Sequence, residues 1–247
     1  RSSAASDVYK RQEYTQICML TAEAAILRAL ELKGYKADVT AGLSLGEYGA
    51  LIACGALSRK DAFALVRKRG IYMQEAVPEG GAMAAVLALD TAQIEEACEK
   101  TEGIVSIANY NCPGQIVITG EEKAVAAAGE LCKEAGAKRV VPLKVSGPFH
   151  SAMLKTAGEK LGEELKHVTV HTPEIPYVAN VTADYVTKEE EIKPLLEKQV
   201  SSSVRWQQTI ERLIADGADK FVEIGPGKTL TGFMRKINRD VVAVNID

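Results

Sequence analysis

Several features are scarce or missing in this chain of 247 residues, and each narrows the range of functions. Lys and Arg number 30 against 33 acidic residues, and the net charge of −3 argues against nucleic-acid binding, which needs a basic surface. The five cysteines are odd in number and have no C-x-x-C spacing, which argues against a disulfide framework or a zinc site. No segment reaches the roughly 18 apolar residues of a membrane span. The sequence therefore predicts a cytoplasmic protein, in a reducing compartment, without a metal.

The first twelve residues, RSSAASDVYKRQ, differ in character from the rest of the chain. They show neither helical nor strand periodicity, and the sequence has no initiator Met. We interpret residues 1–12 as a foreign leader and leave them out of the fold prediction. On this interpretation the natural protein begins upstream of Glu13.

Predicted strands and helices alternate along most of the remaining chain, which is typical of an α/β protein with a mainly parallel sheet. Residues 79–146 instead follow the order βαββαβ of a ferredoxin-like unit. We therefore predict a core built from residues 13–78 and 147–247, with a ferredoxin-like subdomain inserted between these two parts.

A G-x-S-x-G motif is the strongest chemical signal in the sequence, with Ser44 at its centre. It follows a predicted strand over residues 37–43 and opens a predicted helix over residues 45–54, which is the setting of a nucleophile elbow. The amide of Leu45 is then placed to stabilise an oxyanion. The alternative is a glycine-rich turn in which Ser44 only caps the helix.

A nucleophilic serine needs a base, and the chain has only three histidines. His167 and His171 flank a polar segment that we expect to be an exposed strand. His150 instead lies at a strand-to-helix junction, where active-site groups of α/β folds gather. We therefore predict His150 as the base.

Two further motifs leave alternatives open. Arg69 lies toward the apolar stripe of a predicted helix, and its guanidinium could pair with a protein carboxylate or with the carboxylate of a ligand. The turn Gly225-Pro226-Gly227-Lys228 follows a predicted strand. A tight turn before a helix is favoured there over a phosphate-binding loop, because the Walker spacing is absent.

Taken together, the blocks AGLSLGEYGAL, VRKRGIYMQEAVPEGGAMAAV, IANYNCPGQIVITG, LKVSGPFHSAML, VRWQQTIE and EIGPGKTLTGF resemble one family in order and spacing. That family is the malonyl-CoA:acyl carrier protein transacylases of type II fatty-acid synthesis. The resemblance runs from about Tyr14 to Asp247. It implies an α/β-hydrolase-like core that carries a ferredoxin-like subdomain.

The resemblance also implies a reaction and its residues. Ser44 would carry the malonyl group from malonyl-CoA to the phosphopantetheine thiol of acyl carrier protein in a ping-pong reaction, with no cofactor. Arg69 would grip the malonyl carboxylate and His150 would be the catalytic histidine. The side chain of Gln199 would orient His150. We expect a monomer.

Two departures from the family pattern are visible. The family has His before the nucleophile, where this chain has Leu43, and we expect altered local packing with activity retained. The family also opens with a strand and a G-Q-G-S-Q loop that supplies a second oxyanion donor. We find no such loop, and losing one donor costs about 10²–10³ in turnover, so we expect a weakly active or inactive chain.

A finer inference from the residues concerns Phe149, which stands beside His150. Its ring could crowd an α-branch and so favour malonyl over methylmalonyl. Acyl carrier proteins are acidic, so we also expect a local basic patch for docking. The candidates are Lys138, Arg139, Arg205, Arg235 and Lys236.

Other functions remain open on the sequence alone. A serine esterase would hydrolyse simple acyl esters and would not depend on Arg69. A non-catalytic acyl- or CoA-binding module would bind thioesters unchanged without Ser44. An acyltransferase domain of a polyketide synthase is a third alternative, although the chain has no flanking ketosynthase-like sequence.

Overall fold

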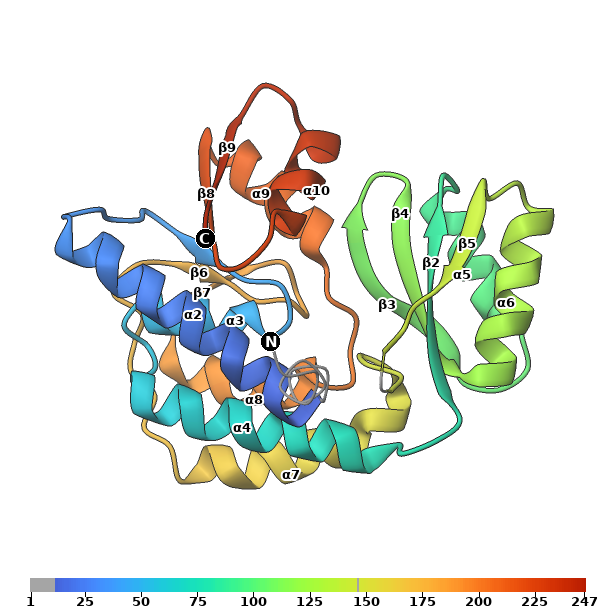
Figure 1. Ribbon diagram of the computed structural model, residues 1–247, viewed down its shortest axis with the longest axis horizontal. Helices are drawn as coiled ribbons and strands as arrows, with labels where there is room; N and C mark the ends of the chain where they lie inside the picture. The colour runs from blue at the N-terminus through green and yellow to red at the C-terminus, as the bar shows by residue number, and fades with distance from the viewer. Residues whose placement is uncertain (1–11, 146) are drawn as a thin grey trace, which may run out of the picture.

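The structure is a computed structural model that describes residues 12–145 and 147–247. The leader predicted over residues 1–12 lies outside the described residues except for its last residue. Figure 1 shows two lobes, a larger one that holds both ends of the described chain and a smaller one built around a single sheet. The predicted α/β fold with an inserted subdomain is confirmed.

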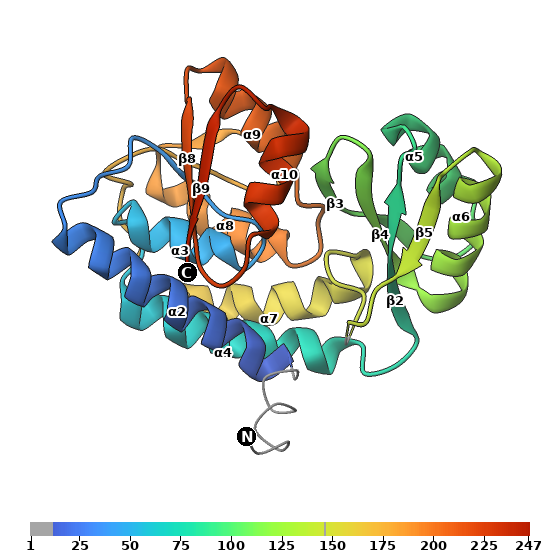
Figure 2. The same ribbon diagram turned by 45° about the horizontal axis from the view of Figure 1, so that its top comes forward.

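The large lobe contains several helices, and the one predicted over residues 45–54 is found as α3 (Gly46–Ala53). One of them starts after Ser58, whose hydroxyl accepts a hydrogen bond from the Asp61 amide at 3.0 Å and so satisfies an amide that the helix leaves free. Three long helices pack side by side on one face, as Figures 1 and 2 show: α2 (Gln12–Leu32), α4 (Arg59–Ala76) and α7 (Lys155–Lys166). The other helical segments are α3 (Gly46–Ala53), the 3-10 turn η1 (Ala152–Leu154), α8 (Glu189–Gln199), α9 (Trp206–Ala215) and α10 (Thr229–Ile237).

Strands of the large lobe form two separate ladders. In the first, β1 (Thr40–Ala41) pairs in parallel with β6 (Tyr177–Val178), which pairs antiparallel with β7 (Tyr185–Val186). In the second, β8 (Lys220–Ile224) and β9 (Val242–Ile246) pair in parallel. The predicted strand over residues 37–43 is thus only two residues long. In the described residues the two ladders do not join, because no strand lies between β1 and β8 to pair with both.

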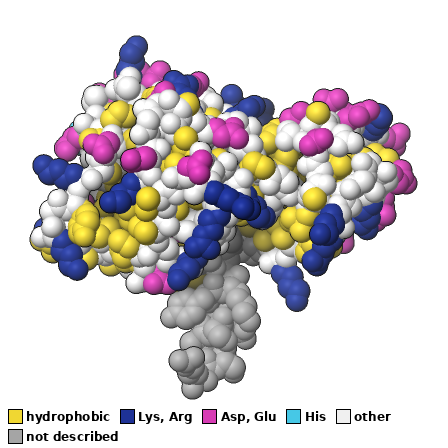
Figure 3. Space-filling model, turned by 90° about the horizontal axis from the view of Figure 1, so that it is seen from above, with side chains coloured by type: hydrophobic (Ala, Val, Ile, Leu, Met, Phe, Trp, Pro, Cys, Tyr) yellow, Lys and Arg dark blue, Asp and Glu magenta, His cyan; other side chains and the backbone are white. Residues whose placement is uncertain are grey.

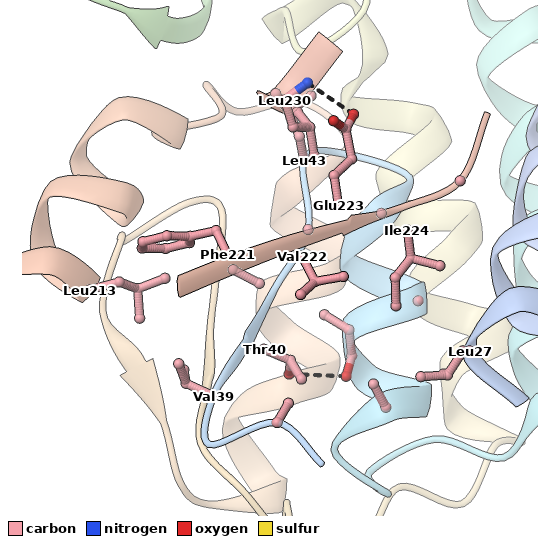
Figure 4. Close-up of a pocket in the computed structure, with 18 of the residues that line it drawn as sticks. Leu27, Val39, Thr40, Leu43, Leu213, Phe221, Val222, Glu223, Ile224 and Leu230 are labelled. Carbon is pink, nitrogen blue, oxygen red and sulfur yellow. Dashed lines mark hydrogen bonds between the residues drawn. The ribbon is translucent and has the colours of Figure 1, made fainter. Parts of the chain in front are cut away.

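An apolar cavity of about 1460 Å³ separates the two ladders. Figure 4 shows Val222 and Ile224 of β8 on one side of it, Thr40 of β1 on another, and Leu27 of α2 at its edge. Leu43, the residue found in place of the family's His, also lines this cavity. The Leu43 side chain therefore belongs to the packing between the ladders.

The small lobe has the predicted βαββαβ order. Its antiparallel sheet has the strand order β3-β4-β2-β5, and α5 and α6 cover one face. The elements are β2 (Gly81–Leu87), α5 (Thr91–Glu99), β3 (Val105–Cys112), β4 (Gln115–Glu121), α6 (Glu122–Glu134) and β5 (Arg139–Pro142). Gly120 is required in β4, because a Cβ there would lie 1.9 Å from the Ile104 carbonyl oxygen.

A short segment after α8 holds the two lobes together. Val204 donates to the Ala108 carbonyl oxygen at 2.8 Å and accepts from the Tyr110 amide at 2.9 Å, so it extends the β3 edge of the small sheet. Phe149 packs against the apolar cores of both lobes. Phe149, next to His150, and the segment that follows Gln199 thus contact both lobes.

Among the described helices, none has the combination of length and apolar character that crossing a bilayer requires.

Candidate active site

Ser44 lies on a sharp turn between β1 and α3, as the motif predicts. Its φ is 54°, in the left-handed region that costs a residue with a side chain about 1–2 kcal/mol. Gly42 makes the turn possible, because a Cβ at that position would lie 1.9 Å from the Gly46 carbonyl oxygen. The strained turn leaves Ser44 partly exposed at the start of α3.

His150 is in direct contact with this serine. Its Nε2 lies 2.7 Å from Ser44 Oγ, and its Nδ1 lies 2.9 Å from the main-chain oxygen of Gln199. A carbonyl oxygen only accepts, so Nδ1 carries the imidazole proton and Nε2 is the acceptor for the Ser44 hydroxyl. The tautomer is therefore the one that a general base needs.

Burial keeps the His150 imidazole neutral. Only 4% of the residue is exposed, and burial, followed by the charge of Arg69, lowers its pKa to about 4. The hydrogen bond to Gln199 acts in the opposite direction but is the weaker effect. At neutral pH the imidazole is thus free to take a proton from Ser44.

This lowered pKa predicts an unusual pH profile. Protonation of the base stops the reaction, so kcat/KM for malonyl-CoA should stay level as the pH falls through 6.5 and should drop about tenfold per pH unit only below about 4. Initial rates from pH 8 downward would test this, with circular dichroism at each pH to show that the chain stays folded. A half-maximal rate near pH 6.5 would contradict the prediction.

Arg69 reaches the same serine from α4. Its Nη2 donates to Ser44 Oγ and to Gln199 Oε1, both at 3.0 Å, and its Nη1 donates to Gln16 Oε1 at 2.5 Å. The residue is only 1% exposed, and its Nε has no hydrogen-bond partner within the described residues. All of these acceptors are uncharged, so in the described part of the chain no ion pair neutralises Arg69. This favours the ligand carboxylate over the protein carboxylate as its partner.

Gln199 contacts His150, but through its main chain and not through its side chain as expected. The side-chain Oε1 accepts from Arg69, and Nε2 donates to the Ser44 carbonyl oxygen at 2.9 Å and to Glu47 Oε2 at 2.7 Å. The last position of α8 turns the main-chain carbonyl toward His150 and the side chain toward the elbow. The sequence pattern identified the residue but could not show which of its atoms makes the contact.

Two neighbours of the nucleophile were missed by the sequence analysis. Glu47 is 1% exposed in the first turn of α3, and burial raises its pKa to about 7. Asn180 is 1% exposed just after β6 and is hydrogen-bonded to the main chain on both sides of the elbow turn. The place of Glu47 within the elbow helix was a usable signal, whereas nothing in the sequence around Asn180 pointed to the elbow.

The other candidate positions are as follows. The main-chain amide of Leu45 makes no hydrogen bond within the described residues, which leaves it free for an oxyanion. His167 and His171 are exposed as expected, although the segment between them forms only an isolated bridge and not a strand. The glycine-rich turn before α10 is not open to phosphate, because Glu223 accepts from the Leu230 and Thr231 amides at the start of that helix (Figure 4).

The three predicted groups therefore converge on one oxygen atom. Ser44 Oγ contacts the imidazole of His150 and the guanidinium of Arg69, and the buried side of this group is closed by Gln199. The apolar cavity between the ladders is lined by Leu43 and Leu45 but not by these three residues. An acyl donor must accordingly approach from the partly exposed face of Ser44.

A strained serine at a helix start, a neutral histidine and a buried arginine on an α/β fold define a serine-dependent acyl-transfer enzyme. In agreement, the family model described as acyl transferase domain matches residues 4–244. The malonyl CoA-acyl carrier protein transacylase of Bacillus subtilis is 49% identical over 235 residues, which cover 94% of this chain and 74% of that protein. The protein of the same name from Escherichia coli is 47% identical over 227 residues, which cover 90% and 74%.

Solved structures agree with these relatives. The crystal structure of MCAT from Streptococcus pneumoniae has a TM-score of 0.95 and 48% identity, covering 98% of this chain and 80% of that one. A malonyl-transacylase in complex with its type II PKS acyl-carrier protein has a TM-score of 0.94 and 42% identity, covering 96% and 78%. The chain belongs to the malonyl CoA-acyl carrier protein transacylase family, and the predicted resemblance is confirmed.

Proposed function

We propose that this chain moves a malonyl group from malonyl-CoA to the phosphopantetheine thiol of an acyl carrier protein, through an ester on Ser44. The observation that carries the proposal is the double contact of Ser44 Oγ, with His150 Nε2 at 2.7 Å and Arg69 Nη2 at 3.0 Å. A base and a carboxylate-binding group beside the same nucleophile suit a thioester whose acyl group ends in a carboxylate.

In the first half-reaction, the neutral imidazole of His150 takes the hydroxyl proton as Ser44 Oγ attacks the thioester carbonyl carbon. The new C–O bond gives a tetrahedral oxyanion, which the free Leu45 amide stabilises. The C–S bond then breaks, and the CoA sulfur leaves with the proton from His150. The Nδ1 hydrogen bond to Gln199 holds the ring in place throughout.

In the second half-reaction, the carrier-protein thiol gives its proton to His150 and attacks the Ser44 ester. The C–O bond breaks, the serine oxygen recovers the proton, and the malonyl thioester leaves on the carrier protein. Each half-reaction returns the imidazole to its neutral form. No step requires a cofactor or a metal, because the thioester is already activated.

Arg69 gives this reaction its preference for a diacid. Its guanidinium is buried and lies 3.0 Å from the serine oxygen, within reach of a carboxylate one methylene beyond the acyl carbon. A carboxylate partner would offset the cost of burying this cation, whereas an acetyl group has no negative charge to pair with the guanidinium. Phe149, beside His150, remains our candidate for limiting a branch on that methylene.

The carrier protein docks on basic side chains near the junction of the lobes. Figure 3 shows Lys and Arg side chains on both sides of the notch between the lobes. All five predicted docking residues are exposed, but only Arg205, Arg235 and Lys236 belong to segments that contact β3 at this junction, where Lys236 Nζ donates to Gln115 Oε1 of the small lobe at 3.0 Å. Lys138 and Arg139 lie at β5, the opposite edge of the small sheet, so the structure does not bring them to the junction. An acidic partner at this junction would lie beside the site, and we expect the reaction to run in the cytoplasm with the chain as a monomer.

Trapping the intermediate tests the proposal. The chain is mixed with malonyl-CoA without carrier protein, quenched in acid, digested and mapped by mass spectrometry. We expect a malonyl ester on the peptide that contains Ser44, lost in Ser44→Ala and discharged when carrier protein bearing a free phosphopantetheine thiol is added. An ester on a different residue, or a signal that persists in Ser44→Ala, would refute the assigned nucleophile.

A further inference from the structure

The strained backbone of Ser44 must be held by contacts from outside the elbow. Its φ of 54° is unusual for a residue with a side chain, and such a conformation persists only where the surrounding structure fixes it. The Ser44 carbonyl oxygen accepts from Gln199 Nε2 at 2.9 Å. The Ser44 amide is bonded to a second side chain, from a segment 136 residues away.

That second side chain belongs to Asn180, which spans the turn. Its Oδ1 accepts from the Ser44 amide at 2.6 Å, and its Nδ2 donates to the Gly42 carbonyl oxygen at 2.6 Å. One planar carboxamide thus bonds the main chain just before the turn and at the nucleophile itself. Only this orientation of the amide satisfies both groups, since the Ser44 N–H must donate and the Gly42 oxygen must accept.

Asn180 is itself fixed through its own main chain. Its amide donates to Glu47 Oε2 at 3.3 Å, and its carbonyl oxygen accepts from the Arg205 amide at 2.9 Å. Glu47 belongs to the first turn of α3, directly after the elbow, and it also accepts from Gln199 Nε2 at 2.7 Å. The hydrogen bonds therefore connect the turn, β6 and the end of α8 in one buried network.

Loss of the Asn180 hydrogen bonds should change the positions of the reacting atoms and should not change substrate binding. Asn180 has no hydrogen bond to His150 or to Arg69, and its side chain bonds only to the elbow main chain. A small rotation of that main chain would move Ser44 Oγ away from His150 Nε2 and would redirect the neighbouring Leu45 amide. Misplacement of reacting groups by about 1 Å can cost about 10²-fold in rate.

We propose that Asn180 is a positioning residue for acyl transfer, whose carboxamide fixes the nucleophile elbow in its reactive conformation and which Glu47 supports from the first turn of α3. This inference rests on the proposed function. It assigns Asn180 no contact with the acyl group, so the substrate-binding contacts of Arg69 are independent of it. Loss of the carboxamide should therefore lower kcat and leave KM for malonyl-CoA nearly unchanged.

Two substitutions at this position test the inference in the full chain. Asn180→Ala removes both hydrogen bonds, and we expect the rate of Ser44 ester formation to fall about 10²-fold, with KM within twofold of the parent value. Asn180→Asp keeps the shape but places an oxygen against the Gly42 carbonyl oxygen in place of the donor. We expect at least a tenfold loss in the rate of ester formation for this variant. The variant therefore tests the positioning role even if Asn180→Ala does not fold.

Asn245→Ala is the matched control. Asn245 is a partly buried Asn of β9 whose Nδ2 donates to the Gly225 carbonyl oxygen at 3.2 Å, away from the site. The Asn245→Ala variant should lose some thermal stability but should form the Ser44 ester at a rate within twofold of the parent. Rapid-quench ester formation, steady-state kcat and KM, and thermal midpoints are measured for all variants.

The outcomes separate this inference from the function on which it rests. If the parent chain forms the Ser44 ester and both Asn180 variants form it within threefold of the parent rate, the positioning role is wrong. A raised KM for malonyl-CoA with an unchanged kcat would also overturn the positioning role, because that result would place Asn180 in substrate binding. A parent chain that forms its malonyl ester on a residue other than Ser44 overturns the proposed function and the inference together.

Discussion

His150→Ala should lower kcat by about 10⁴, at the upper end of what a general base contributes. The serine hydroxyl would lose its proton acceptor at 2.7 Å, and the leaving thiolate would lose its proton donor. Single-turnover ester formation on Ser44 and steady-state transfer to carrier protein measure the two half-reactions separately. Both should fall, because the same imidazole serves both.

The chain provides matched controls for this substitution. His167 and His171 are exposed, and replacing either with Ala should leave kcat within twofold. His150→Gly is a second variant without the imidazole, and glycine relieves the strain of a φ of 60° at this position. A His150→Gly chain that unfolds cooperatively and still transfers malonyl at more than a tenth of the parent rate would rule out His150 as the base.

Arg69→Ala should lower kcat/KM for malonyl-CoA by about 10³ and should have little effect on the slow reaction with acetyl-CoA. Removing one partner of a buried, hydrogen-bonded charge pair costs about 2–5 kcal/mol, and each 1.4 kcal/mol is about a tenfold change. Acetyl-CoA has no carboxylate and so gains nothing from the guanidinium. The measured quantity is the ratio of kcat/KM for the two donors, which should fall toward one.

Two further substitutions interpret this result. Arg69→Lys keeps the charge but loses the planar fork, so it should recover only part of the preference for malonyl. Arg59→Ala, at the start of the same helix, removes an exposed ion pair with Glu31 and should change neither donor's rate by more than twofold. An unchanged donor ratio in a folded Arg69→Ala chain would show that the guanidinium is structural, as an esterase would require.

Fold prediction succeeded where the periodicity was long and local. The helix that opens at the nucleophile, predicted over residues 45–54, was placed within one residue of its true ends, because the glycine-rich turn before it and the apolar run within it are local signals. The strand at β1 was overestimated, since its pairing with β6 ends after two residues and that pairing is not encoded in the segment itself. The predicted limits of the inserted subdomain, residues 79–146, stay a prediction.

The sequence by itself determined the class of chemistry. The glycines around Ser44, the small number of histidines and the position of Arg69 on an apolar stripe restricted the nucleophile, the base and a buried cation to single residues. These signals are local, because a turn, a cap or a helix face depends on neighbours within a few positions.

Only the tertiary structure decided how these groups act. It placed Arg69 and His150 around the hydroxyl oxygen of Ser44, left the guanidinium without a hydrogen-bonded carboxylate, and turned the main chain of Gln199 toward the imidazole. It also placed Asn180 against an elbow 136 residues earlier. These hydrogen bonds, and the burial that shifts the pKa of His150, depend on which distant segments meet in the fold. The two partners of each contact lie too far apart in the chain for any short stretch of sequence to contain both.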